Sequence, residues 1–288
     1  MPNSELTLMV VHAHPDDEAL STGGILHRYA GEGIKTVLVT CTGGELGDGP
    51  GGIKPGQPGH DEAQVRATRR LELEQACGQL RIRHLEMLGY LDSGMAGWSQ
   101  NNRPGSLSGV PLDQALARLV PILERYRPQI LVSYDEQGGY GHPDHIRTHE
   151  LAREAALRTG IPRKLYYTAF AKSSFRRALQ AAKDAGVPLD KLPAVDFDPD
   201  NPPFGVDDDV ITTTIDVSAD VPAKLAALRA HGSQADNGFV LDLPQVVAAT
   251  FMGQEHFIRA IDKTNAPVPE SDLFAGLRED EKGHRLPS

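Results

Sequence analysis

Short apolar runs alternate with amphipathic stretches through the first 160 residues of the chain. Runs rich in Val, Leu and Ile that end at polar or glycine residues are typical of buried strands. They predict strands over 6–13, 35–43, 84–90 and 128–135. Apolar residues at helical spacing follow these runs and predict helices over 18–33, 61–80, 111–126 and 143–160.

Two of these helices carry start signals, with Asp61 as a candidate N-cap and Pro143 in a first turn. Strands that alternate with helices predict an α/β fold, with a mostly parallel, Rossmann-like sheet flanked by helices. Ligands bind in such folds at the carboxyl ends of the strands. Two long glycine-rich loops, 43–60 and 92–109, leave predicted strands at that edge.

The pattern weakens after residue 160 and predicts a smaller α+β part. Its expected elements are strands over 164–170 and 209–217 and helices over 172–186 and 222–234. A polar, proline-rich connection covers 196–209, and the polar tail after Ala266 is expected to be partly disordered. We therefore divide the chain into a Rossmann-like core, residues 1–165, and a C-terminal part, residues 166–288, that completes the same domain.

Composition narrows the class of protein. The chain has 288 residues, 40% hydrophobic and 24% charged, as in an ordinary globular protein. A net charge of −10 argues against nucleic-acid and anionic membrane partners. No apolar run is long enough to span a bilayer, and no basic segment precedes an apolar one at the N-terminus. Cys41 and Cys77 form no disulfide framework, so we expect a cytoplasmic protein; nothing here predicts an oligomeric state.

Two related motifs carry the candidate chemistry. "HPDD" (14–17) follows the first predicted strand, and "HPDH" (142–145) follows the strand over 128–135. Both place a proline near the start of a helix. Two such loops at one sheet edge can face each other across a pocket.

A catalytic zinc ion typically takes three protein ligands and leaves one position open. His14, Asp17 and His145 supply that number, and the first two stand one helical turn apart. Asp16 is then a free carboxylate beside the metal, able to act as a general base. The sequence thus favours metal-assisted hydrolysis.

The second motif offers two further groups. Asp144 could hydrogen-bond a nearby imidazole, and His142 could face the substrate. His12, inside the strand end, is interpreted as a packed or hydrogen-bonded core imidazole. The Arg69-Arg70 pair would ordinarily lie on a solvated helix face.

Three other interpretations compete. Carboxylates at a helix start are often only caps favoured by the helix dipole. Two histidines and a carboxylate also form the facial triad of non-haem Fe(II) oxygenases, and His14 with Asp16 has that spacing. Oxygenase sites of this kind normally lie on an all-β jelly roll, whereas the ligands here follow predicted parallel α/β strands. The oxygenase interpretation therefore ranks behind hydrolysis. A closed structural metal site in a binding protein would use four ligands, often cysteines, and neither cysteine is near.

"HAHPDDEAL" (12–20) together with "GHPDHIRTH" (141–149) resembles the PIG-L/LmbE-like family of zinc-dependent N-deacetylases. The flanks "TCTGGELGD", "LDSGMAG", "KLAALRAHGSQ" and "GQEHF" are similar to those of its mycothiol-pathway members, which act on N-acetylglucosaminyl-inositol. The resemblance runs over roughly residues 5–260. It implies a small-molecule sugar substrate and zinc as cofactor, with ferrous iron as the alternative metal.

The resemblance also implies residue roles. His14, Asp17 and His145 match the metal ligands, and Asp16 matches the general base. His142 matches a group that stabilises the oxyanion or, if charged, protonates the leaving amine. Asp144 matches a carboxylate that tunes an imidazole, and Tyr140 matches a mobile tyrosine that polarises the amide carbonyl. The positions that match sugar-binding residues are Arg69 and Asp92, with weaker matches at Ser21 and Glu45.

Two relatives within the family remain alternatives. Mycothiol S-conjugate amidases carry proline where this chain has Gly141, which favours the deacetylase. The loop "WSQNNRPGSLSG" (98–109) has no clear counterpart, so it could carry different substrate contacts, as in deacetylases of antibiotic pathways.

Overall fold

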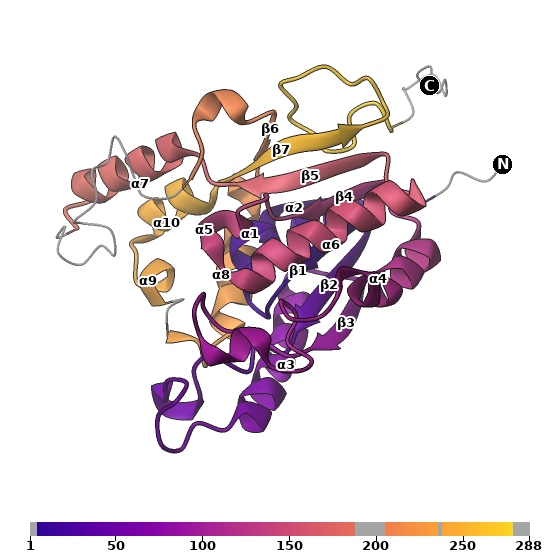
Figure 1. Ribbon diagram of the computed structural model, residues 1–288. Helices are drawn as coiled ribbons and strands as arrows, with labels where there is room; N and C mark the ends of the chain where they lie inside the picture. The colour runs from indigo at the N-terminus through magenta and orange to yellow at the C-terminus, as the bar shows by residue number, and fades with distance from the viewer. Residues whose placement is uncertain (1–4, 188–204, 236–237, 279–288) are drawn as a thin grey trace.

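A seven-stranded sheet forms the centre of the protein, in the order β3-β2-β1-β4-β5-β7-β6 (Figure 1). This computed structural model describes residues 5–187, 205–235 and 238–278. Strands β1 to β5 run parallel, whereas β7 is antiparallel to β5 and β6. The strands are β1 (Thr7–His12), β2 (Lys35–Thr42), β3 (His84–Tyr90), β4 (Ile130–Ser133), β5 (Lys164–Ala169), β6 (Thr213–Asp216) and β7 (Gln254–Asp262). The predicted α/β fold with a mostly parallel sheet is confirmed.

Helices cover both faces of the sheet (Figure 1). The α-helices are α1 (Asp17–Ser21), α2 (Gly23–Gly31), α3 (Glu62–Gln79), α4 (Leu112–Tyr126), α5 (Gly138–Gly141), α6 (Pro143–Thr159), α7 (Lys172–Asp184), α8 (Val221–Ala230), α9 (Gly238–Leu241) and α10 (Gln245–Met252). Short 3-10 helices are η1 (Pro50–Gly52), η2 (Ser99–Asn102), η4 (Asp208–Val210) and η5 (Ser218–Asp220).

Strand β1 shows how the core is divided. Met9 and Val11 pack with residues of α4 and α6, while Leu8 and Val10 pack with residues of α2 and α3. Every residue of β1 is buried, because a parallel strand between two helical layers has no solvent face. This explains the continuous apolar run from which the strand was predicted.

The strands and helices predicted in the first 160 residues are present, with one difference. The helix expected over 18–33 is interrupted at Thr22, whose φ of −141° separates α1 from α2. The Thr22 hydroxyl bonds to His12 Nε2 at 2.8 Å and donates to the Glu18 carbonyl at 3.3 Å. Such local side-chain bonds compete with helical pairing. The break turns the amides of Gly24 and Ile25 toward the Glu255 carboxylate, at 2.7 and 2.9 Å.

The C-terminal part contains elements that the pattern did not predict, namely β7, α9 and α10. Strand β7 lies between β5 and β6. One of its buried residues is Glu255, whose charge is paired with buried Lys224 at 2.6 Å. A charged residue in an inward position conceals the apolar alternation by which half-buried strands are recognised.

The first part of the tail, which was expected to be partly disordered, is ordered as far as residue 278. Leu273 and Phe274 are fully buried in the core beside α2. Buried Lys164 donates to the Glu270 carboxylate at 2.6 Å and to the Ala275 carbonyl at 2.7 Å, which fastens the tail to β5. Residues 279–288 lie outside the described residues.

The proposed division at residue 165 falls inside β5, and β4 and β7 continue one sheet on its two sides. The division stays a prediction. Most of the proline-rich connection, 196–204, lies outside the described residues. Among the residues that are described, no helix has the length and apolar character needed to cross a membrane.

We expect Phe274→Ala to lower the free energy of unfolding by about 3–5 kcal/mol, because it leaves a cavity in the core. The measurement is urea denaturation. Leu71→Ala is the control, since Leu71 is 60% exposed and such surface changes usually stay within about 0.5 kcal/mol. Equal losses in the two variants would show that the tail is not part of the core.

Candidate active site

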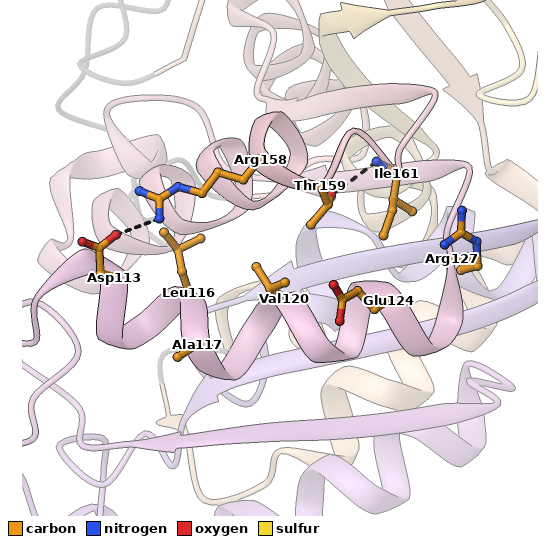
Figure 2. A pocket seen from close by; sticks show the side chains of 9 residues that line it. All are labelled: Asp113, Leu116, Ala117, Val120, Glu124, Arg127, Arg158, Thr159 and Ile161. Carbon is orange, nitrogen blue, oxygen red and sulfur yellow. Dashed lines mark hydrogen bonds and ion pairs between the residues drawn. The ribbon is translucent and has the colours of Figure 1, made fainter.

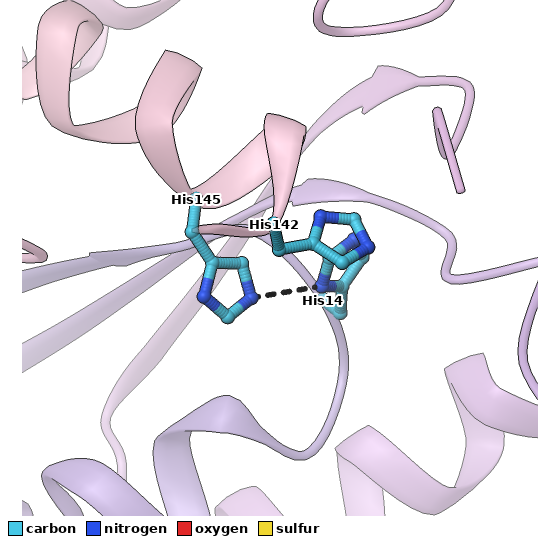
Figure 3. Close-up of side chains that lie close together, drawn as sticks. All are labelled: His14, His142 and His145. Carbon is cyan, nitrogen blue, oxygen red and sulfur yellow. Dashed lines mark hydrogen bonds between the residues drawn. The ribbon is translucent and has the colours of Figure 1, made fainter. Parts of the chain in front are cut away.

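The two histidine motifs meet at the carboxyl edge of the sheet. Strands β1 and β4 are parallel neighbours, with Leu8 opposite Ile130. The loop after β1 therefore lies beside the loop after β4, which enters α6. Figure 3 shows His142 and His145 projecting from the start of α6 toward His14.

Three of the predicted side chains converge on one point. His145 Nε2 lies 3.3 Å from His14 Nδ1 and 3.4 Å from Asp17 Oδ1. His14 Nδ1 is 3.6 Å from the other Asp17 oxygen. Two nitrogens bound to one tetrahedral zinc at about 2.0–2.1 Å would stand about 3.3–3.4 Å apart. The spacing of the two imidazole nitrogens therefore fits a zinc-sized ion, with a different Asp17 oxygen beside each of them.

The tautomers of the two imidazoles agree with that fit. His145 Nδ1 donates to the Gly138 carbonyl at 3.1 Å, and His14 Nε2 lies 3.2 Å from Asp144 Oδ2, which can only accept. When His14 is neutral, as a metal ligand must be, the lone pairs of His145 Nε2 and His14 Nδ1 face the same point. Either a proton shared by the two nitrogens or a metal ion removes the repulsion between these lone pairs, so the donor set fits a metal ion.

Electrostatics point the same way. Burial opposes charge on His14, yet the carboxylates of Asp92, Asp144 and Asp17 raise its pKa well above the usual range. Burial also opposes charge on Asp17, but His145 and His14 hold the pKa of that carboxyl well below its usual range. The cluster thus favours positive charge at its centre.

Among the described residues, two groups of three side chains bring one ligand atom each within 4.8 Å of one another, and neither includes Asp17. His14, His142 and His145 form one, and His14, Asp92 and Asp144 form the other. Asp144 already accepts from the Ser93 amide at 2.8 Å and from the Ser93 hydroxyl. Its carboxylate therefore orients His14 rather than offering an open ligand position.

Asp16 is held beside this cluster in an uncommon backbone conformation. Its φ is 112°, in the left-handed region that non-glycine residues rarely adopt. Arg69 Nη2 lies 3.0 Å from Asp16 Oδ2, and the Asp16 amide donates to Glu18 Oε2 at 2.9 Å. Burial raises the pKa of Asp16 to about 6, against the lowering effect of Arg69.

His142 differs from the expectation of a charged acid. Burial and the nearby His14 and His145 lower its pKa to about 3, so the ring is neutral. The Asp144 amide donates to His142 Nδ1 at 3.1 Å, which places the ring proton on Nε2. The environment therefore supports the oxyanion-stabilising alternative and not the charged acid.

A model of one known protein family matches residues 9–156, under the description "PIG-L: GlcNAc-PI de-N-acetylase". The chain belongs to the PIG-L family. A 1D-myo-inositol 2-acetamido-2-deoxy-alpha-D-glucopyranoside deacetylase from Thermobispora bispora is 43% identical, covering 94% of this chain and 98% of that protein. One of the same name from Acidothermus cellulolyticus is 41% identical, covering 94% and 95%. The predicted family is thereby confirmed.

A solved structure of a deacetylase shares the fold. The N,N'-diacetylchitobiose deacetylase from Pyrococcus horikoshii aligns with a TM-score of 0.56 at 19% identity, covering 88% of this chain and 83% of that one. At that identity the likeness concerns the fold alone. It agrees with the Rossmann-like architecture expected of a PIG-L chain.

Tyr140, which was expected to polarise the amide carbonyl, lies in α5, a single turn with non-helical backbone angles at Gly139 and Tyr140. It is 62% exposed, and its ring centre is 5.0 Å from that of His145. Gly139 and Gly141 flank it with φ of 74° and 88°. Glycine tolerates these angles, so the loop can present the phenol above the site.

The residues expected to bind the sugar are mostly engaged within the protein. Arg69 donates to the Gly44 carbonyl at 2.8 Å, to the Pro15 carbonyl and to Asp16. This buried arginine is not on the solvated face that its helix pattern favoured. Ser21 ends α1 and is partly exposed. Their roles toward substrate stay predictions.

The two buried carboxylates of this set link the loops after β2 and β3. Glu45 Oε1 accepts from Arg66 at 2.7 Å, from Arg103 at 3.0 Å and from the Asp92 amide at 3.1 Å. Asp92 accepts from the amides of Leu46 and Gly94 at 3.2 and 2.8 Å. Asp92 Oδ1 is also 3.7 Å from His14 Nε2, so this carboxylate lies at the edge of the cluster formed by His14, Asp17 and His145.

The loop 98–109 supports the site from outside. Its Arg103 also donates to the Asp92 carbonyl at 3.0 Å. The Ser108 amide donates at 3.0 Å to the Ser93 hydroxyl, which in turn bonds Asp144. The segment without a counterpart in the family motifs is thus connected to His14 through Ser93 and Asp144.

Sequence reasoning missed the pair formed by Glu18 and His231. Both side chains are buried, and His231 Nε2 lies 2.7 Å from Glu18 Oε1. Glu18 in turn holds the Asp16 amide. Both residues stand inside quoted family motifs, but 213 positions separate them along the chain. Only the packing of α8 against α1 brings them together.

A separate hollow lies between α4 and α6, lined by Leu116, Val120, Glu124, Arg158 and others (Figure 2). Arg158 stands thirteen residues after His145 on α6, about 20 Å along the helix axis at 1.5 Å per residue. The hollow is therefore not part of the PIG-L site.

His12 is buried and bonded to Thr22, as predicted for a core imidazole.

We expect alanine at His14, Asp17 or His145 to weaken divalent-metal binding by more than the ~10–100-fold typical of losing an orienting partner. His12→Ala should retain metal affinity and instead lose about 1–3 kcal/mol of stability, since it removes a buried hydrogen-bond partner. Chelator competition and urea denaturation measure the two effects. A ligand variant with wild-type metal affinity would contradict the assignment.

Proposed function

We propose that this chain is a zinc-dependent N-deacetylase that removes the acetyl group from N-acetylglucosaminyl-inositol. The observation that carries the proposal is the convergence of His14, Asp17 and His145 within 3.3–3.6 Å, with Asp16 held alongside. Similarity to deacetylases of that named substrate over nearly their whole length supports the choice of substrate.

His14, Asp17 and His145 would hold the metal. A zinc ion bound there would act as a Lewis acid beside the scissile amide. One carboxylate and two imidazoles, with no cysteine, suit zinc and also ferrous iron. The chain's own residues must then supply base, oxyanion donor and substrate contacts.

Asp16 is proposed to accept the proton of the attacking water. Its pKa near 6 leaves it ionised at neutral pH yet basic enough to take up a proton. The protonated carboxyl can then pass that proton to the leaving amine, so one group serves both transfers. Between the two proton transfers, Arg69 holds the Asp16 carboxylate and Glu18 holds the Asp16 backbone amide.

His142 and Tyr140 are proposed to stabilise the oxyanion. Neutral His142 carries its ring proton on Nε2, and the amide of Asp144 holds the other nitrogen. Desolvation at the site and the carboxylates of Asp17 and Asp16 raise the pKa of Tyr140, although the side chain as a whole is 62% exposed, so its phenol stays protonated as a second donor. Preorganised donors of this kind need no protonation change during the reaction.

Two alternatives are less well supported. Gly141 has a φ of 88°, whereas proline requires about −65°. The proline of the amidase motif would therefore require a different path for the Tyr140 loop. The Fe(II) oxygenase alternative needs Asp16 as a ligand, but Asp16 is paired with Arg69 and the sheet is mostly parallel rather than a jelly roll.

The cytoplasm remains the proposed compartment. Cys41 and Cys77 are both free and buried, as expected of a chain folded under reducing conditions. We propose no nucleic-acid or membrane partner, in line with the net charge of −10.

The zinc-loaded protein should release acetate from N-acetylglucosaminyl-inositol with a higher kcat/KM than from free N-acetylglucosamine. The free sugar lacks the inositol contacts, and remote binding energy contributes to kcat/KM. Amine release from both sugars and from a mycothiol S-conjugate makes the comparison. Equal values for the two sugars would point to a general deacetylase, and preference for the S-conjugate would identify an amidase.

Asp16→Ala should keep its metal and lose about 10²–10⁴-fold in kcat/KM. Because Asp16 works ionised, the wild-type rate should fall as the pH drops through a pKa at or below about 6, since the metal's charge lowers that value. His142→Ala should lower kcat about 10²–10³-fold, as expected for an oxyanion donor, and retain that acid limb. The measurement is kcat/KM against pH with metal content checked. Near-normal turnover in metal-loaded Asp16→Ala would place the base elsewhere.

A further inference from the structure

Tyr134 contacts two of the three residues assigned to the metal, yet no motif singles it out. It follows β4 directly and is buried. Its hydroxyl accepts from the Ala13 amide at 2.9 Å and donates to Asp17 Oδ2 at 2.6 Å. Its ring stacks on His145, with centres 4.2 Å apart and planes 15° from parallel.

The hydroxyl determines which oxygen of Asp17 remains available. Asp17 Oδ2 also accepts from the His14 amide at 2.8 Å. A carboxylate oxygen has about two lone-pair sites, so these two donors occupy Oδ2. Oδ2 still lies 3.6 Å from His14 Nδ1, so its two hydrogen bonds rather than its distance distinguish it from Oδ1, which lies 3.4 Å from His145 Nε2.

The ring acts independently of the hydroxyl. It lies flat against the His145 imidazole, whose Nδ1 is held by the Gly138 carbonyl. The stack and this hydrogen bond together fix the plane of the imidazole. Tyr134 itself is fixed at both ends, because its carbonyl lies 3.0 Å from His149 Nδ1.

We propose that Tyr134 is a positioning residue that makes Asp17 bind the metal through Oδ1 alone. The inference rests on the metal ligands of the proposed function. Single-oxygen binding uses one coordination position for Asp17 and leaves the others for water and substrate. Without the hydroxyl, Oδ2 loses a donor and can turn toward the ion.

The test is Tyr134→Phe, which keeps the stacked ring and deletes the hydroxyl. The matched control is Tyr166→Phe on neighbouring β5, a buried tyrosine whose hydroxyl donates to Glu270 at 2.8 Å. Cobalt(II) is the probe, titrated against a chelator and followed by its visible d–d absorption. That absorption weakens as the coordination number rises.

Tyr134→Phe should bind cobalt about 10–100-fold more weakly, the usual effect of losing a partner that orients a ligand. Its d–d absorption should also fall, whereas Tyr166→Phe should match the wild type in both readouts. Thermal unfolding of both variants separates loss of fold from loss of positioning. Wild-type affinity and spectrum in folded Tyr134→Phe would overturn the proposal.

A measurement on the wild type keeps the proposal testable if Tyr134→Phe does not fold. Infrared difference spectra between metal-free and zinc-loaded protein show the stretches of every carboxylate that zinc perturbs, and the bands that the spectrum of Asp17→Asn lacks belong to Asp17. A wide separation of the two stretches is expected for single-oxygen binding, and a narrow one would overturn the proposal. None of these readouts uses substrate, so failure of acetate release by the wild type would count against the proposed function alone.

Discussion

The parallel pairing of β1 with β4 is the constraint on which the site depends. Each strand is followed by a loop that opens a helix, and parallel neighbours end at the same edge. His14 and Asp17 follow β1 in the chain, and His142 and His145 follow β4 and the short α5. A change in this pairing would separate the two motifs, whatever their own conformations.

Charge balance around one imidazole then organises the cluster. His14 is bound on one nitrogen by a buried carboxylate and presents the other to His145 and Asp17. Asp144 is itself held by Ser93. The lone pairs and carboxylates at the centre repel one another unless a proton or a metal ion lies among them. Such an arrangement is costly in a buried site and is typical of residues kept for function rather than for stability.

The backbone conformation of Asp16 is a second feature of the site that costs stability. A non-glycine residue in the left-handed region costs about 1–3 kcal/mol. Arg69 and the Glu18–His231 pair supply the contacts that hold it there. His231 follows α8, and nearby Gln234 bonds the Asp48 amide at 3.2 Å. The C-terminal part thus contributes to the site even though the family model ends at residue 156.

Much of this was available from the sequence alone, because strand runs, helix periodicity and the two motifs are local signals. They determined the α/β class and the elements before residue 160, and they predict His14, Asp17 and His145 as the metal ligands. Only the tertiary structure decided which groups support that set. Ser93 and His231 lie inside quoted motifs, but no local pattern gives their partners or those of Tyr134, since these partners are distant in the chain and are selected by packing. The same reason applies to β7, where Glu255 is buried because Lys224 faces it. It applies as well to His142, whose neutral state is set by burial and neighbouring imidazoles that no sequence pattern records.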